Sequence, residues 1–152
     1  DGAALAAIYA PYVENSWVSF ETEAPDATEM ARRIADYGQS HAWLVAERGD
    51  AILGYAYASP HRTRAAYATS ADIAIYIADH ARGQGVGRAL YTALFDRLRA
   101  RSIHAVFAGI ALPNPASIAL HEAMGMVPVG IYREVGWKFG GWRDVGWWQR
   151  LL

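Results

Sequence analysis

The sequence predicts an α/β (α+β) fold in which helices cover both faces of a mixed central sheet. Its helical and strand patterns follow in the order α-α-β-β-β-α-β-α-β-β. This order is neither a repeat of βαβ units nor a block of strands followed by a block of helices, and it favours a mixed sheet. The chain has 152 residues, of which 53% are hydrophobic. That is enough apolar material for one domain spanning residues 1–152.

The first quarter of the chain predicts two helices. Apolar residues recur at helical spacing over residues 2–14, although Pro11 should kink or weaken this helix. Residues 15–25 connect it to a second helix over residues 26–37, where Gly38 is the expected stop signal.

The middle of the chain predicts three strands and a helix. Residues 42–47 and 51–59 are expected to form a hairpin around the turn at 48–50. A long strand over residues 69–78 follows. Leucine and valine then recur every four residues from Val86, which indicates an amphipathic helix ending near residue 102.

The last third predicts strand, helix and two strands. Residues 104–111 form a strand of the buried type, and residues 115–124 form a helix for which Asn114 is a suitable cap. The last strands are expected at 127–132 and 145–151. Four of the six tryptophans fall in the last sixteen residues, and two of these are adjacent in a strand and point to opposite faces. One of the two faces therefore meets a helix or a second subunit.

A glycine-rich turn between strand and helix predicts an anion site. Glycines at 83, 85 and 87 precede the helix, so free backbone N–H groups and the positive end of the helix point to one place. Arg88-Ala89 follows where a P-loop needs Lys and then Ser or Thr, and the G-x-G-x-G spacing is not that of a dinucleotide fingerprint. A turn without a ligand is the alternative. The candidate residues are Arg82, Gly83, Gln84, Gly85, Val86, Gly87 and Arg88.

Composition excludes several classes of function. The net charge of −1 provides no basic field for nucleic acid or an anionic membrane, and no apolar run is long enough to span a bilayer. Without cysteine, there is no disulfide, thiolate metal site or cysteine nucleophile. The five histidines show no ligand spacing, so no metal is expected. No signal peptide is visible, and we expect a cytoplasmic protein.

Asp72 is the candidate general base. Strand alternation places it on the face of Ala74 and Tyr76, opposite the face of Ile73 and Ile75. A carboxylate in an otherwise apolar strand loses hydration, which raises its pKa toward the range that a base needs near neutral pH. The alternative is an aspartate in water or in a salt bridge. Arg62 and Arg64, in the preceding loop, are suited to binding a carboxylate or phosphinate, unless they are merely solvated.

Two motifs resemble the GCN5-related N-acetyltransferase (GNAT) superfamily. Arg82-x-x-Gly85-x-Gly87 resembles its pyrophosphate loop, and Asn114–Met126 resembles its closing motif, with His121 where many members have a tyrosine that protonates the CoA thiolate. With a strand added upstream of residue 1, which we expect to be missing, the element order is that of the superfamily. A lone helical histidine is more often a buried structural side chain, whereas within this motif the functional and the structural role of His121 are both open.

Longer segments resemble the phosphinothricin N-acetyltransferase family in particular. The family implies transfer of acetyl from acetyl-CoA to the α-amine of phosphinothricin, methionine sulfoximine or methionine sulfone, and a homodimer. These segments are Tyr12–Glu23, Trp43–Glu47, Gly54–Pro60, Ala111–Ser117, Leu120–Gly125 and Gly136–Gln149.

The resemblance also implies roles for residues of this chain. The base falls on Asp72, the active-site histidine on His121 and the anion-binding pair on Arg62 and Arg64. The pocket aromatics fall on Phe20 and Tyr67. The residues expected along the acetyl-CoA arm are Ile75, Tyr76, Ile77, Asn114 and Ser117.

Two departures from the family pattern bear on the function. The family has glutamate where this chain has Asp72, which is one methylene shorter, and Arg62 stands where the best-known members have lysine or another residue. A displacement of about 1 Å at a catalytic group can cost about 100-fold in rate. The rivals are a protein or peptide N-terminal acetyltransferase and an acyl-CoA-binding sensor without strong catalysis.

Overall fold

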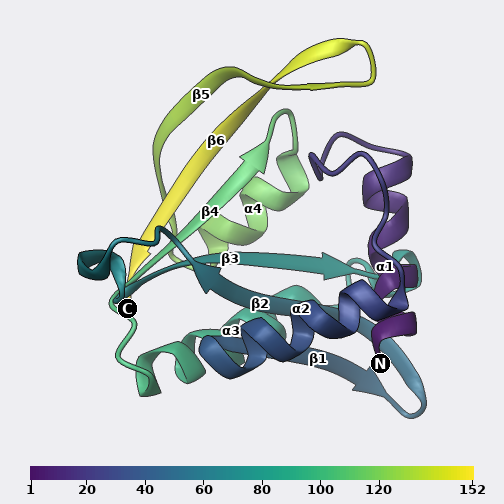
Figure 1. Ribbon diagram of the computed structural model, residues 1–152, viewed down its shortest axis with the longest axis horizontal. Helices are drawn as coiled ribbons and strands as arrows, with labels where there is room; N and C mark the ends of the chain where they lie inside the picture. The colour runs from purple at the N-terminus through teal and green to yellow at the C-terminus, as the bar shows by residue number, and fades with distance from the viewer.

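The computed structural model describes residues 1–152 as a six-stranded sheet with helices on both faces (Figure 1). The strand order is β1-β2-β3-β4-β6-β5, with β3 and β4 parallel and all other neighbours antiparallel. The predicted element order is confirmed. The elements are α1 (Gly2–Glu14), α2 (Ala27–Ser40), β1 (Ala42–Arg48), β2 (Ala51–Pro60), η1 (Ala65–Tyr67), β3 (Ser70–Ile77), η2 (Asp79–Ala81), α3 (Val86–Ala100), β4 (Ala105–Ala111), α4 (Pro115–Ala123), β5 (Val127–Lys138) and β6 (Gly141–Leu151).

Three elements extend beyond the boundaries predicted from the sequence. Gly38 does not end α2, which continues to Ser40 and closes with a bond from the His41 N–H to the Tyr37 carbonyl. A single glycine weakens a helix without breaking it. The last two strands are longer than predicted, because their pairing continues past two register shifts to the turn at Phe139 and Gly140.

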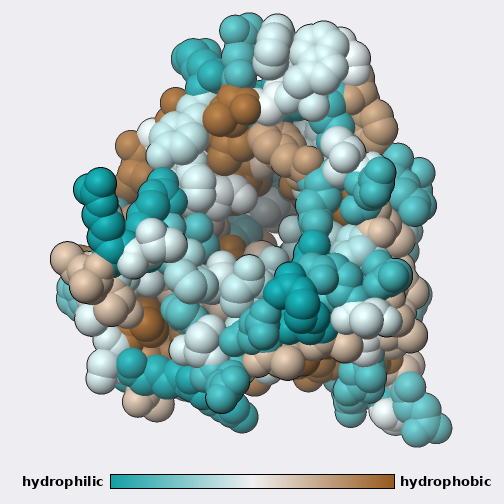
Figure 2. Space-filling model, viewed as in Figure 1, coloured by the Kyte–Doolittle hydropathy of each residue, from teal (hydrophilic) through white to brown (hydrophobic).

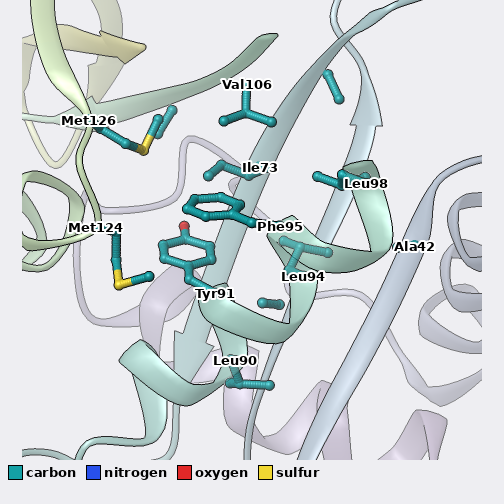
Figure 3. Close-up of a cluster of buried hydrophobic side chains, with 14 of the residues drawn as sticks. Ala42, Ile73, Leu90, Tyr91, Leu94, Phe95, Leu98, Val106, Met124 and Met126 are labelled. Carbon is teal, nitrogen blue, oxygen red and sulfur yellow. The ribbon is translucent and has the colours of Figure 1, made fainter. Parts of the chain in front are cut away.

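The larger core lies between the sheet and α3 (Figure 3). Helix α3 turns Leu90, Tyr91, Leu94, Phe95 and Leu98 inward, as their helical spacing requires. They pack against sheet residues such as Ile73 and Val106 and against Met124 and Met126, which follow α4.

The smaller core lies on the opposite face, under α1 and α2. Its buried residues include Leu5 and Tyr9 of α1, Met30 of α2 and Tyr55 of β2. Tyr76 of β3 packs on this side, with its ring centroid 4.7 Å from that of Tyr9. The predicted alternation of β3 is therefore confirmed, and Asp72 faces the side of α1.

Strands β3 and β4 separate soon after they begin, and Figure 1 shows the gap that results. Their pairing runs only from Ser70 to Asp72 on β3. The Ala78 N–H bonds to the Leu53 carbonyl of β2, so by antiparallel alternation the N–H and C=O groups of Ile75 and Ile77 point away from β2. These groups lie on the open edge. No helix of the chain is long and apolar enough to cross a membrane.

Candidate active site

The glycine turn presents a row of backbone donors at the start of α3. None of the N–H groups of residues 83–88 donates to a protein acceptor. Gly83 and Gly85 have φ of 73° and 79°, a region in which an L side chain is strained, and the space where their side chains would stand is open. Together with the helix dipole, these donors fit a diphosphate.

The third glycine of the turn has a different purpose. A Cβ at Gly87 would lie 3.0 Å from Leu120 Cδ2 of α4. Gly87 thus allows α3 and α4 to approach each other closely. Val86 is buried in the larger core, between α3 and the sheet.

Polar side chains hold the turn against the rest of the molecule. Arg82 donates to the Tyr12 hydroxyl at 3.0 Å and pairs with Asp79, and the same hydroxyl donates to the Ile77 carbonyl at 2.7 Å. Gln84 accepts a hydrogen bond from Arg48. The end of β3 and the turn are therefore fixed together through α1. Arg88 is exposed and in no ion pair, so its charge is available beside the turn.

Asn114 and Ser117 lie where α4 begins, across the gap from β3. The Asn114 side chain accepts a hydrogen bond from the Ser117 N–H and caps α4, which confirms the predicted cap. Its carboxamide N–H₂ group has no protein partner.

A cavity of about 310 Å³ opens beside this gap. Figure 2 shows the hollow in the centre of the face, below the hairpin of β5 and β6. Asp72 is its only ionisable carboxylate, and the rest of the lining is mostly apolar. The lining residues are Val18, Ser19, Phe20, Tyr57, Ser59, Asp72, Ile73, Ala74, Tyr76, Gly109, Ala111, Val145 and Trp147.

Asp72 is paired with a histidine that the sequence analysis missed. Asp72 Oδ1 lies 2.6 Å from His61 Nδ1. Burial is the largest influence on the carboxyl and raises its pKa, while the His61 hydrogen bond opposes this. His61 belongs to no sequence motif. It lies beside Asp72 because the antiparallel register of β2 and β3 pairs Ser59 with Asp72. The two adjacent predicted strands were the only sequence feature that could have indicated this contact.

The basic pair and Tyr67 lie on the surface, in the segment that follows His61. Arg62, Arg64 and Tyr67 are all exposed, and none of them lines the cavity. Arg62 donates to the His61 carbonyl at 2.8 Å, and the Tyr67 ring lies 5.9 Å from the His61 ring. Phe20 does line the cavity, and it packs so closely on Gly136 of β5 that a Cβ there would collide with its ring.

His121 lies apart from Asp72, buried between α4 and α3. Only 4% of His121 is exposed, and it does not line the cavity. Nδ1 donates to the Ser117 carbonyl at 2.7 Å, so Nε2 is the acceptor for the Tyr91 hydroxyl at 2.8 Å. Both ring nitrogens are engaged, which leaves no lone pair for a proton from the substrate.

The burial of His121 predicts a loss of stability in acid. Burial lowers the pKa of His121 below its ordinary 6.5. As the pH falls through 6.5, the unfolded chain takes up a proton that the folded chain does not, so the free energy of unfolding should fall. Urea denaturation at about pH 7.5 and about pH 5 measures this difference. His121→Gln should show a smaller difference, and an equal difference would contradict the assignment.

Lys138 fastens the loop that forms one wall of the cavity. It is the only lysine of the chain and is buried. Its ammonium donates to the carbonyls of Val13, Ser19 and Glu21 at 2.6, 2.7 and 2.7 Å. Residues 15–25 are thereby held against β5.

Comparison with known proteins identifies the family. Residues 1–147 match the model of the acetyltransferase (GNAT) domain. The chain belongs to the GNAT acetyltransferases. It is an acetyl-CoA-dependent N-acetyltransferase, and the family and fold predicted from the sequence are confirmed.

Particular relatives place this acetyltransferase close to the phosphinothricin N-acetyltransferases. One from Streptomyces coelicolor is 41% identical over 152 residues, which cover 97% of this chain and 89% of the relative. A phosphinothricin acetyltransferase from Sinorhizobium meliloti, solved in complex with acetyl-CoA, has a TM-score of 0.93 and 36% identity, covering 100% of this chain and 85% of that one. A ribosomal-protein-alanine N-acetyltransferase from Brucella melitensis has a TM-score of 0.96 and 36% identity, covering 100% of this chain and 94% of that one.

Proposed function

We propose that this acetyltransferase acetylates the α-amine of a small amino-acid analogue of the phosphinothricin or methionine sulfoximine type. The observation that carries the proposal is the cavity of about 310 Å³, with Asp72 in its wall, beside the open edge of β3. This volume is near the lower end of the range for ligand pockets, about 300–1,000 Å³. The relatives with phosphinothricin acetyltransferase names support the same substrate class.

The binding of acetyl-CoA is proposed to use backbone groups. The N–H groups of residues 83–88 take the diphosphate, aided by Arg82, Gln84 and Arg88. The backbone groups of Ile75 and Ile77, on either side of Tyr76 at the open edge of β3, pair with the pantetheine arm. Asn114 and Ser117 border the arm from α4. Acetyl-CoA supplies an activated thioester, and the Ile75 N–H stabilises the oxyanion that develops at its carbonyl.

The amino acid is proposed to enter the cavity with its carboxylate or phosphinate toward the rim. The guanidinium groups of Arg62 and Arg64 are proposed to bind this anion, and Phe20 and Tyr67 are proposed to contact the substrate. Asp72 takes part in removing a proton from the substrate ammonium. The amine then attacks the thioester directly, and positioning supplies much of the rate.

A panel of amines tests the function. Purified protein and acetyl-CoA are mixed with methionine sulfoximine, phosphinothricin, methionine sulfone, the amine that lacks the α-carboxylate, and a peptide with N-terminal alanine, and a dye reports free thiol. We expect turnover of the α-amino acids and little of the decarboxylated amine. Turnover of the peptide alone would favour a protein acetyltransferase, and acetyl-CoA binding without turnover would favour a sensor.

We also propose that the enzyme is a homodimer. The edge strand β5 and its hairpin expose large apolar side chains, which a monomer seldom leaves in water. A second copy of the chain is the proposed occupant. Sedimentation analysis should give twice the chain mass, and a monomer at all concentrations would contradict the proposal. The exposed side chains are Val127, Val129, Ile131, Tyr132, Val135, Trp137, Phe139 and Trp142.

A further inference from the structure

His61 is the only side chain that forms a hydrogen bond with Asp72. A carboxylate only accepts hydrogen bonds, so the Nδ1 atom of a neutral His61 carries the proton that is donated to Oδ1. Nε2 then holds a lone pair, and it has no hydrogen-bond partner in the protein. This is the reverse of His121, where both nitrogens are engaged.

The ring of His61 is clamped beside the cavity, between residues that line it, although His61 is not itself a lining residue. It stacks on Phe107 of β4 with a centroid distance of 4.4 Å and an angle of 21° between the planes. It also packs edge-on with Trp147 of β6, with the two ring centroids 6.4 Å apart. Trp147 and Asp72 both line the cavity, and the His61 side chain remains 16% exposed. The imidazole is thus fixed in orientation but still reachable by water.

Few charged groups face this pair. Besides Asp72 on β3, the nearby ionisable side chains are Tyr67, the last residue of η1, and Arg62 and Arg64 in the loop that follows His61. The residues that β4 and β6 present to the ring, Phe107 and Trp147, do not titrate. The Asp72 carboxylate is therefore the one anion in contact with the imidazole.

We propose that His61 accepts the proton of the substrate ammonium and that Asp72 orients the imidazole for this transfer. The inference rests on the proposed function and deepens it. The N–H bond of the ammonium breaks, its electron pair stays on nitrogen, and the proton bonds to Nε2 directly or through one water. The imidazolium then returns the proton to the departing thiolate or to solvent.

Two physical reasons favour the imidazole over the carboxylate. An imidazole is ordinarily a stronger base than a carboxylate. The ring also extends the reach of the site, so an aspartate that is shorter than the family's glutamate no longer has to meet the amine itself. Asp72 then has the role that orienting carboxylates have in other His–Asp pairs.

His61→Asn separates a catalytic role from a structural one. The Asn carboxamide places an N–H donor near the position of Nδ1, so Asp72 keeps its partner, whereas Nε2 is absent. We expect kcat to fall by on the order of 100-fold or more. The acid limb of the kcat/KM profile should shift or disappear, and acetyl-CoA affinity measured by calorimetry should be unchanged. His61→Phe, which keeps the stack on Phe107, should be equally slow.

The outcomes distinguish this inference from the proposed function. If the wild type acetylates α-amino acids and His61→Asn keeps both kcat and the acid limb, His61 is structural and the inference is overturned. If the wild type binds acetyl-CoA but acetylates no amine, the proposed function fails first. The NMR chemical shifts of the His61 ring nitrogens are a readout without turnover. They should show the proton on Nδ1 in the wild type and lose this preference in Asp72→Asn, and an unchanged tautomer would contradict the dyad.

Discussion

Replacement of Asp72 by Asn is expected to lower kcat by on the order of 100- to 10,000-fold. The amide keeps the shape of the side chain but can neither accept a proton nor stabilise a protonated His61. The wild-type carboxyl lies in the cavity wall, where burial raises its pKa. Initial rates over a range of amino-acid concentrations and pH measure the effect.

Acetyl-CoA affinity should be unchanged in Asp72→Asn, because the glycine turn that is proposed to hold the diphosphate is separate from the carboxylate. Asp50→Asn is a matched control, since Asp50 is exposed in the turn between β1 and β2 and should retain wild-type kinetics. Unchanged turnover in Asp72→Asn would remove both Asp72 and the dyad from the mechanism.

Replacement of Lys138 by Met is expected to lower the free energy of unfolding by about 3 kcal/mol. Met fills a similar volume but leaves the buried carbonyls of Val13 and Ser19 without their donor. The loop that carries Phe20 should also loosen, so KM for the amino acid should rise more than kcat falls. Urea denaturation at one fixed protein concentration measures the stability, because an oligomer's stability depends on concentration.

Two comparisons make the Lys138 result specific. Arg97→Met changes an exposed cation on α3, away from the loop and from β5, and should leave both stability and KM near wild type. Because Lys138 is the only lysine, amine labelling followed by peptide mapping reports directly on opening of the loop. In the folded wild type, Lys138 should label far more slowly than in the same protein unfolded in urea. Equal labelling rates would show that the loop is open in solution and would contradict the anchoring role.

Local patterns in the sequence were sufficient for most of the architecture. Helical spacing predicted α1 and α3, a capping asparagine predicted the start of α4, and alternation predicted the two faces of β3. These features depend on residues within a few positions of one another. The lengths of β5 and β6 were missed because bulges continue their pairing where glycine and tryptophan obscure the alternation.

The same distinction between local features and long-range contacts holds for the site. Its motifs, from the glycine turn to Asp72, could be read from the chain because they are local and resemble a family. Which groups meet Asp72 could not, because His61 reaches it only through the register of β2 and β3.

The sequence by itself determined the family, the order of the elements, the phosphate-type turn and a carboxylate in an apolar strand. Only the tertiary structure decided that this carboxylate is paired with His61, that His121 is enclosed with both nitrogens engaged, and that Lys138 binds carbonyls more than a hundred positions away. The physical reason is that such contacts arise from strand register and from the packing of distant elements. Residue type and spacing along the chain do not encode them locally.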